Sequence, residues 1–296
     1  MTASIAVIGA PTSAGAFAPG QEDAPAALRA AGLVEALGAS DRGDTPSFRW
    51  RVDHHEPRAM NADAVVDGVR AVAAKVEQAL RAGELALVLG GDCTVGIGTV
   101  AGAVAAGAEP RLVYLDLHPD LNTAQSVPDG ALDWTGVAHM LDVEGADERL
   151  AAAGPRRPLL ADDDLVLLGA GPEQCTAAER GAISARDLRP IGVDDLRADP
   201  VAAARAALAR ATAGGRRFLV HFDVDVIDFS DVPLSENTGR GIGVGFDAAL
   251  SALGVLVAHE ALLALTVTEL NPHHGAQDGA DVARLARALA GALRPV

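Results

Sequence analysis

Leu112-Val113-Tyr114-Leu115-Asp116-Leu117-His118-Pro119-Asp120 (LVYLDLHPD) joins a short apolar run to two acids and a histidine. About a hundred positions later the pattern returns, where residues 218–222 lead into Asp223-Val224-Asp225 (DVD). Short apolar runs of this kind are typical of buried strands, and α/β enzymes place their chemistry where such strands end. The two stretches therefore predict a buried sheet with polar side chains gathered at one edge.

The acids in both stretches occupy alternate positions, and alternate side chains of an extended segment point the same way. Asp116, His118 and Asp120 can then converge on one point. Asp223 and Asp225 can converge in the same manner. Without cations, four carboxylates and an imidazole packed together would repel one another strongly. Mixed oxygen and nitrogen donors suit Mn²⁺ or another borderline divalent metal, and so many carboxylates suggest two ions.

A third apolar run, Leu85–Leu89, leads into Gly90-Gly91-Asp92-Cys93-Thr94 (GGDCT). Its two glycines allow a tight turn, and Cys93 could offer a thiolate to a metal. An isolated DxHxD is often only a turn with a capping aspartate, and an isolated cysteine is more often a packed core residue. Because three such strand ends occur in one chain, the metal interpretation is favoured.

Helical patterns alternate with the apolar runs. Residues 63–82 place valines and a leucine on one face, and residues 200–211 and 281–293 show the same spacing. Strands are expected near Leu85, Leu112, Leu165, Phe218 and Leu262. This alternation predicts an α/β fold with one domain over residues 1–296, a three-layer parallel sheet with helices on both faces.

Composition indicates a cytoplasmic enzyme. The chain has 296 residues, 49% of them hydrophobic, which is enough for a large core, and no apolar run is long enough to span a membrane. Its start lacks the basic flank and apolar region of a signal peptide, and two cysteines make no disulfide framework. A net charge of −16 repels nucleic acid and anionic membranes and attracts a cationic substrate.

Taken together, these segments resemble the ureohydrolase family, the arginases and agmatinases. The matching segments follow the family's order: residues 5–11 with Gly20 and residues 24–29, then GGDCTVGIG, DLHPDLNT, FDVDVID and Thr268-Glu269-Leu270-Asn271-Pro272. Each segment alone is a weak signal, but together they are specific. The resemblance implies an arginase-like fold, two Mn²⁺ ions as cofactors, a small guanidino substrate as partner, and assembly as a homo-oligomer.

The resemblance also implies a role for each site residue. One metal would take Cys93, Asp116, Asp120 and Asp223, and the other would take His118, Asp116, Asp223 and Asp225. The ions would share Asp116, Asp223 and a hydroxide that attacks the guanidino carbon. Asp120 would carry the proton of that hydroxide to the leaving nitrogen, and Glu269 would face the guanidinium.

The chain departs from the family pattern at several site positions. The family usually has a histidine ligand where Cys93 stands, and a thiolate would make the metal a weaker Lewis acid. Thr135, itself a candidate substrate contact, replaces another histidine of the family. His139 is a candidate substitute for that histidine, the alternative being a packed or surface residue. Asn122 and Glu173 match positions that contact the amino-acid end of the substrate, although Asn122 could equally form an Asx turn.

The altered positions favour a modified guanidine as substrate. We expect hydrolysis of Nω-hydroxy-L-arginine to ornithine and hydroxyurea, the reaction of arginase-like hydrolases in cycloserine-type antibiotic biosynthesis. Arginase is the first alternative, and formimidoylglutamase, agmatinase and guanidinobutyrase share the same metal motifs. A metal-poor, non-catalytic relative is the alternative class. Loss of a carboxylate ligand would indicate such a relative, and all the acids are present.

Overall fold

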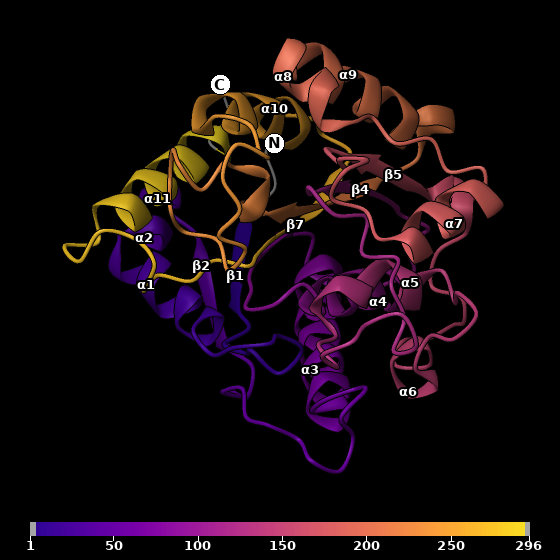
Figure 1. The fold of residues 1–296 in the computed structure, drawn as a ribbon. Coiled ribbons are helices and arrows are strands. Elements are labelled where there is room, and N and C mark those ends of the chain that lie inside the picture. The colour runs from indigo at the N-terminus through magenta and orange to yellow at the C-terminus, as the bar shows by residue number, and fades with distance from the viewer. Residues whose placement is uncertain (1–3, 294–296) are drawn as a thin grey trace.

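Seven parallel strands form one sheet within residues 4–293, which the computed structural model describes. Their order across the sheet is β2 (Ser40–Asp44), β1 (Ile5–Gly9), β3 (Leu85–Leu89), β7 (Leu262–Thr268), β6 (Phe218–Asp223), β4 (Arg111–Leu115) and β5 (Leu165–Leu168). The chain colours of Figure 1 show that strands from distant parts of the sequence lie next to one another in this sheet.

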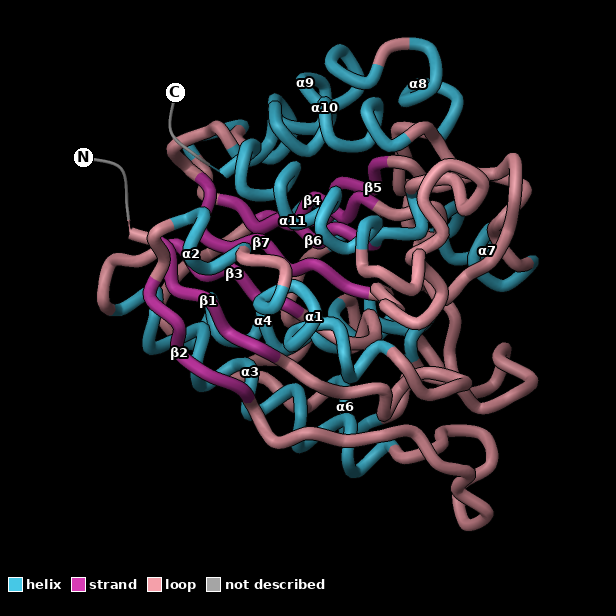
Figure 2. Tube along the Cα trace, turned by 90° about the vertical axis from the view of Figure 1, so that its left-hand side faces the viewer, coloured by secondary structure: helices cyan, strands magenta, loops and turns pink. Residues whose placement is uncertain are grey.

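Helices cover both faces of the sheet, as Figure 2 shows with α9 and α10 above the strands and α3 below them. One face carries α1 (Ala24–Ala30), α2 (Leu33–Leu37), α8 (Val193–Ala198), α9 (Pro200–Ala211), α10 (Phe246–Val257) and α11 (Ala280–Leu293). The other carries α3 (Ala62–Arg81), α4 (Val95–Ala105), α5 (Gly136–Met140), α6 (Glu148–Ala151) and α7 (Ala177–Ala185). This is the predicted three-layer α/β architecture.

The strands are buried on both faces, which explains their unbroken apolar runs. In β4, Leu112 and Tyr114 belong to the apolar cluster beneath α3 and α4, whereas Val113 and Leu115 belong to the cluster on the opposite face. The helix predicted over residues 63–82 is α3, and those predicted over 200–211 and 281–293 are α9 and α11. None of the helices described in residues 4–293 is both long and apolar enough to cross a membrane.

The edge strand β2 has no counterpart in the sequence prediction. All five of its residues, Ser-Asp-Arg-Gly-Asp, are exposed, so it lacks the apolar pattern by which strands are recognised. Backbone pairing with β1 and two ion pairs hold it in place: Arg29 of α1 contacts Asp41 at 2.8 Å and Asp44 at 2.6 Å. A charged edge of this kind also discourages pairing with another chain.

Candidate metal centre and substrate pocket

The candidate site lies at the carboxyl ends of four neighbouring strands, β3, β7, β6 and β4. Cys93 follows β3 after a short turn, and Glu269 directly follows β7. Asp223 is the last residue of β6, and Asp116 is the first residue after β4. Parallel strands end at the same edge of a sheet, so these four distant segments meet there.

A glycine turn joins the loops after β3 and β7. A Cβ atom on Gly91 would lie 1.6 Å from the carbonyl oxygen of Thr12, so only glycine permits this approach. The amide of Cys93 donates to Oε1 of Glu269 at 2.8 Å, and the amide of Glu269 donates to the carbonyl of Gly91 at 2.8 Å. The backbone therefore fixes Cys93 and Glu269 relative to each other.

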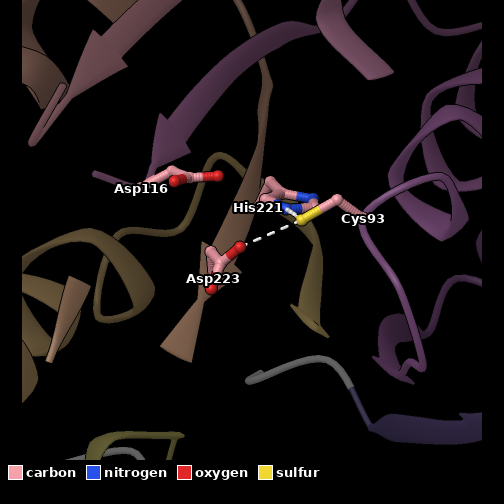
Figure 3. Close-up of side chains that lie close together, drawn as sticks. All are labelled: Cys93, Asp116, His221 and Asp223. Carbon is pink, nitrogen blue, oxygen red and sulfur yellow. Dashed lines mark hydrogen bonds between the residues drawn. The ribbon is translucent and has the colours of Figure 1, made fainter. Parts of the chain in front are cut away.

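One group of metal-binding side chains is fully buried. Cys93, Asp116, His221 and Asp223 present ligand atoms that all lie within 4.8 Å of one another. Cys93 Sγ lies 3.0 Å from Oδ2 of Asp223 and 3.4 Å from Nε2 of His221, the two contacts that Figure 3 draws as dashed lines. A soft sulfur donor thus stands among hard carboxylates and one imidazole.

A second group consists of Asp116, His118 and Asp225. Nδ1 of His118 lies 3.0 Å from Oδ2 of Asp225 and 3.5 Å from Oδ1 of Asp116. Asn237 also donates through Nδ2 to Oδ2 of Asp225 at 3.2 Å. Asp116 belongs to both groups, so the arrangement offers two adjacent metal positions with a shared carboxylate.

Asp120 lies beside these groups without belonging to either. Its Oδ2 accepts a 2.5 Å hydrogen bond from the hydroxyl of Tyr114, and its backbone has a φ of 49°. The segment from Asp116 to Asp120 is bent, and Asp225 lies in the short 3₁₀ helix Val224–Val226. Loop geometry therefore brings the acids together, and the expectation of extended alternation was wrong for both segments.

Burial and mutual repulsion shift the titration of the acids. Burial, followed by the charge of Asp225, raises the pKa of Asp116 to about 7 and holds that of Asp223 well above its usual range. Burial and then Asp223 also raise the pKa of the Cys93 thiol. Asp225 is the exception: burial opposes its charge, but His118 and the hydrogen bond from Asn237 together lower its pKa.

Two carboxylate oxygens in the centre, Oδ2 of Asp116 and Oδ1 of Asp225, are buried and have no hydrogen-bond partner within the described part of the chain. A buried carboxylate is costly unless it is paired or coordinates a metal. Divalent cations would neutralise the charge of the crowded acids and would coordinate the two carboxylate oxygens that lack partners. The donor set therefore fits the metal ions that the sequence predicts.

A cavity of about 510 Å³ opens onto these side chains. Its wall includes Cys93, His118, Asp120, Asp223, Asp225 and Glu269 together with Phe17, Asp129, Asp133, Trp134, Gln174, Glu236, Asn237 and Thr238. Among the described residues that line it there is neither lysine nor arginine. Burial and then Asp92 raise the pKa of the Asp133 carboxyl in this wall. The cavity suits a cationic or strongly hydrogen-donating ligand.

Glu269 is held with its carboxylate toward this cavity. Oε1 accepts the amide of Cys93, and Oε2 accepts a 3.0 Å hydrogen bond from Nε2 of Gln21. The backbone of Glu269 adopts a φ of 60°, a region that costs energy for a residue with a side chain and often occurs at functional sites. Burial and then Asp133 raise its pKa. Glu269 lines the cavity, and its contact with a guanidinium stays a prediction.

Three predicted substrate contacts lie outside the cavity wall. Thr135 is buried and donates to the carbonyl of Leu132 at 2.5 Å. Asn122 is also buried, and its Oδ1 accepts hydroxyl groups from Ser126 at 3.0 Å and Thr176 at 2.9 Å. Glu173 is exposed at the surface. In their neighbourhoods, Asp133, Trp134 and Gln174 line the cavity instead.

His139 is a packed core residue, the alternative that the sequence left open. Its Nδ1 contacts the carbonyl of Thr135 at 2.7 Å, and its Nε2 accepts the amide of Asp147 at 3.1 Å. Burial lowers its pKa to about 4, so the ring is neutral near pH 7. Because both nitrogens are engaged within the protein, this histidine does not stand ready as a proton shuttle.

Sequence reasoning missed His221, although a signal for it existed. It lies two positions before Asp223 in β6, and alternation in a strand places both side chains on one face. A histidine inside an otherwise apolar buried strand was therefore a candidate for the metal centre. Asn237 had no comparable signal, because it lies in a loop with no regular side-chain period.

The family model described as the arginase family matches residues 3–293. The chain belongs to the arginase family. It is 29% identical over 279 residues to an arginase of Agrobacterium fabrum, and the aligned region covers 90% of this chain and 83% of that protein. It is 27% identical over 283 residues to an arginase of Brevibacillus brevis, with 92% of each chain covered. The predicted family is thereby confirmed.

Solved structures of arginase-family proteins agree with the fold. The arginase of Bacillus caldovelox superposes with a TM-score of 0.87 at 26% identity, covering 99% of this chain and 98% of that one. Formimidoylglutamase of Bacillus subtilis superposes with a TM-score of 0.74 at 18% identity over 100% and 89% of the two chains, a likeness of fold alone. This arginase-family protein is accordingly a hydrolase of C–N bonds in linear amidines, as predicted.

Proposed function

We propose that this arginase-family protein is a binuclear manganese amidinohydrolase that converts Nω-hydroxy-L-arginine and water to ornithine and hydroxyurea. The observation that carries the proposal is the thiol of Cys93 within the buried ligand group, 3.0 Å from Oδ2 of Asp223. Sulfur at this position alters the metal chemistry while every carboxylate of the centre is kept.

The residues that we propose to hold the ions are those implied by the family resemblance; they include five members of the two ligand groups, with Asp120 added from the cavity wall. Cys93, Asp116, Asp120 and Asp223 would hold the first ion, and Asp116, His118, Asp223 and Asp225 would hold the second. When bound, two manganese ions supply Lewis acidity that makes water nucleophilic near neutral pH.

Two carboxylates of the chain would act on the substrate: one would orient the guanidine, and the other would transfer a proton. Glu269, fixed by Cys93 and Gln21, accepts N–H groups of the guanidine and orients its central carbon. Asp120, whose Oδ2 accepts the hydroxyl of Tyr114, would take a proton from the attacking water. That proton passes to the δ-nitrogen as its bond to the guanidino carbon breaks, and ornithine leaves as the amine.

The chemistry of the donor set favours an N-hydroxyguanidine over arginine. A thiolate donates more electron density than an imidazole, so the ion it binds is a weaker Lewis acid. Arginine carries a strongly basic, delocalised guanidinium that resists attack. An N-hydroxyguanidine is less basic and has a more electrophilic neutral form, which a weaker Lewis acid can still activate.

The amino-acid end of the substrate would lie toward the outer wall of the cavity. Asn122, Thr135 and Glu173 are our proposed contributors there, and a contact with the substrate requires a movement of the loops that carry them. Gln174 already lines the cavity beside Glu173. We further propose a cytoplasmic location and a homo-oligomeric state, which activity in cell fractions and light scattering would test.

Kinetics with saturating manganese test the proposal. We expect kcat/KM for Nω-hydroxy-L-arginine to exceed that for arginine by about tenfold or more, equivalent to about 1.4 kcal/mol in transition-state free energy. Agmatine and formimidoylglutamate serve as control substrates that test whether the enzyme recognises the amino-acid end of Nω-hydroxy-L-arginine. Equal or better turnover of arginine would make the protein an arginase, the activity named for its relatives. No turnover of any guanidine, with manganese bound, would refute the enzymatic assignment.

A further inference from the structure

We propose that Tyr114 and His221, whose rings are stacked beneath the candidate metal centre, are positioning residues that hold Asp120 and Cys93 in place for the first metal ion. The inference deepens the proposed function and rests on it. It concerns residues that belong to no part of the ligand set implied by the family resemblance.

The two rings form a rigid unit across neighbouring strands. Tyr114 of β4 pairs in register with His221 of β6, and their ring centroids are 4.1 Å apart with an interplanar angle of 9°. Both side chains are buried. A Cβ atom on Gly96 of α4 would lie 2.6 Å from Nδ1 of His221, so the glycine makes room for the imidazole. Packing on all sides restricts both rings to one orientation.

Each ring holds one residue of the metal centre. The hydroxyl of Tyr114 donates to Oδ2 of Asp120 at 2.5 Å. Nε2 of His221 lies 3.4 Å from Sγ of Cys93, a contact visible in Figure 3. The hydroxyl of Thr268 completes a triangle, 3.0 Å from Nε2 and 3.4 Å from the sulfur. The stack thus reaches the two ligands that belong to the first ion alone.

The environment of the imidazole indicates which nitrogen carries its proton. Nδ1 of His221 is buried without a hydrogen-bond partner, whereas Nε2 has two polar neighbours. A buried N–H with no acceptor is rarer in proteins than an acceptor without a donor. The proton therefore belongs on Nε2, where it points toward Thr268 and Cys93. In this tautomer His221 donates a hydrogen bond and is not itself a ligand.

Donors around the sulfur would affect the metal as well as the geometry. His221 and Thr268, each with a polar atom 3.4 Å from the sulfur, would withdraw electron density from a metal-bound Cys93 by donating hydrogen bonds to it. Such donors partly offset the weakening of Lewis acidity that a thiolate causes. Groups that orient ligands in this way usually contribute about 10- to 100-fold to metal affinity.

Three substitutions remove the contacts one at a time. Tyr114→Phe keeps the stacked ring and deletes only the hydroxyl that contacts Asp120. Thr268→Val and His221→Gln alter the donors next to Cys93. Thr266→Val is the matched control, since Thr266 is also buried in β7 but its hydroxyl donates to Thr99 at 2.8 Å. Bound manganese per chain is measured by titration and elemental analysis after dialysis.

A second readout follows the sulfur itself. The cobalt(II) protein should show a thiolate-to-cobalt absorption band that is absent from Cys93→Ser. We expect the band to shift or weaken in His221→Gln and Thr268→Val, to persist in Tyr114→Phe, and to be unchanged in Thr266→Val. All three test variants should bind the first manganese about 10- to 100-fold more weakly, with the second ion retained.

The outcomes separate this inference from the proposed function. A wild-type protein that binds no manganese contradicts the proposed function, and the positioning roles with it. Wild-type metal binding with unchanged affinity and cobalt spectrum in every variant overturns the positioning roles alone. A manganese-bound structure in which Nε2 of His221 is a ligand also overturns them. Should His221→Gln not fold, the Tyr114→Phe and Thr268→Val proteins decide the question.

Discussion

The two sides of the candidate metal centre are built on different principles. One side, called here the His118 side, consists of His118 and Asp225, a base and an acid whose Nδ1 and Oδ2 atoms lie 3.0 Å apart. Asn237 donates a hydrogen bond to the carboxylate of Asp225. Burial opposes the charge on the histidine, but Asp225 and Asp116 together raise the pKa of His118 well above its usual range. The other side, called here the Cys93 side, consists of the thiol of Cys93 and the carboxylate of Asp120. Burial raises the pKa of both groups.

This contrast shows where the centre depends on a cation. The His118 side has an internal counter-charge, because a protonated imidazole can balance Asp225. Among the described residues that line the cavity, none gives the Cys93 side a lysine or arginine, and its polar neighbours from the strands below include Tyr114, His221 and Thr268. We therefore expect the first ion to be the more easily lost and the more sensitive to substitution.

Removing a shared carboxylate should have the largest effect, because it breaks both sides at once. Asp116→Ala and Asp223→Ala should each lose both ions and all measurable turnover, a larger loss than the roughly 100-fold cost of deleting an outer contact. Metal analysis and kinetics on the purified variants check this. By comparison, His118→Ala should disturb mainly the second ion.

Asp194→Ala is a suitable control, since Asp194 is an exposed acid whose side chain is 85% accessible at the surface. Full activity in either Asp116→Ala or Asp223→Ala without bound divalent metal would disprove the assignment of a metal centre. Retention of exactly one ion in both would instead show that these acids do not bridge.

Replacing the sulfur donor should have an intermediate effect on metal binding, and this effect should be confined to the Cys93 side. Cys93→His should raise manganese retention on the Cys93 side by roughly tenfold, because imidazole suits Mn²⁺ better than thiolate does. The relative kcat/KM for plain arginine should rise with it. Competitive dialysis and paired kinetics measure both, and a crystal structure with Sγ turned away from two fully bound ions would refute a ligand role for Cys93.

The smallest expected effect is the dependence of the stability of the metal-free protein on pH. Burial raises the pKa of Asp116 to about 7 from an ordinary value of 3.8, so between those values the folded state holds a proton that the unfolded chain has lost. The free energy of unfolding should therefore fall as pH rises through this window. The raised pKa of His118 acts in the same direction, since its stabilisation is present below about 6.5 and lost at higher pH.

Thermal melts with a chelator should accordingly give a lower melting temperature at pH 8 than at pH 5. Asp225 does not reverse the trend, because its lowered pKa affects stability only under more acidic conditions. Saturating manganese should flatten the dependence by holding the carboxylates ionised. A chelated protein whose melting temperature rises over this range would contradict the raised pKa of Asp116.

The sequence alone determined the layered sheet and most of the acids at its edge. Buried strands and amphipathic helices leave periodic apolar patterns, so β3, β4, β6 and β7 could be located before their neighbours were known. The acids of the candidate centre directly follow those patterns in the chain. The edge strand β2 carries no such pattern, because exposed strands need no apolar face.

Only the tertiary structure decided which side chains act on one another across the sheet. The stack of Tyr114 on His221 depends on the register between β4 and β6, whose residues are separated by about a hundred positions. Likewise, loop geometry placed Asp133 in the cavity wall and left Thr135 buried behind it. Local patterns report whether a residue is buried, but contacts between distant strands and irregular loops follow from long-range packing, which no local period encodes.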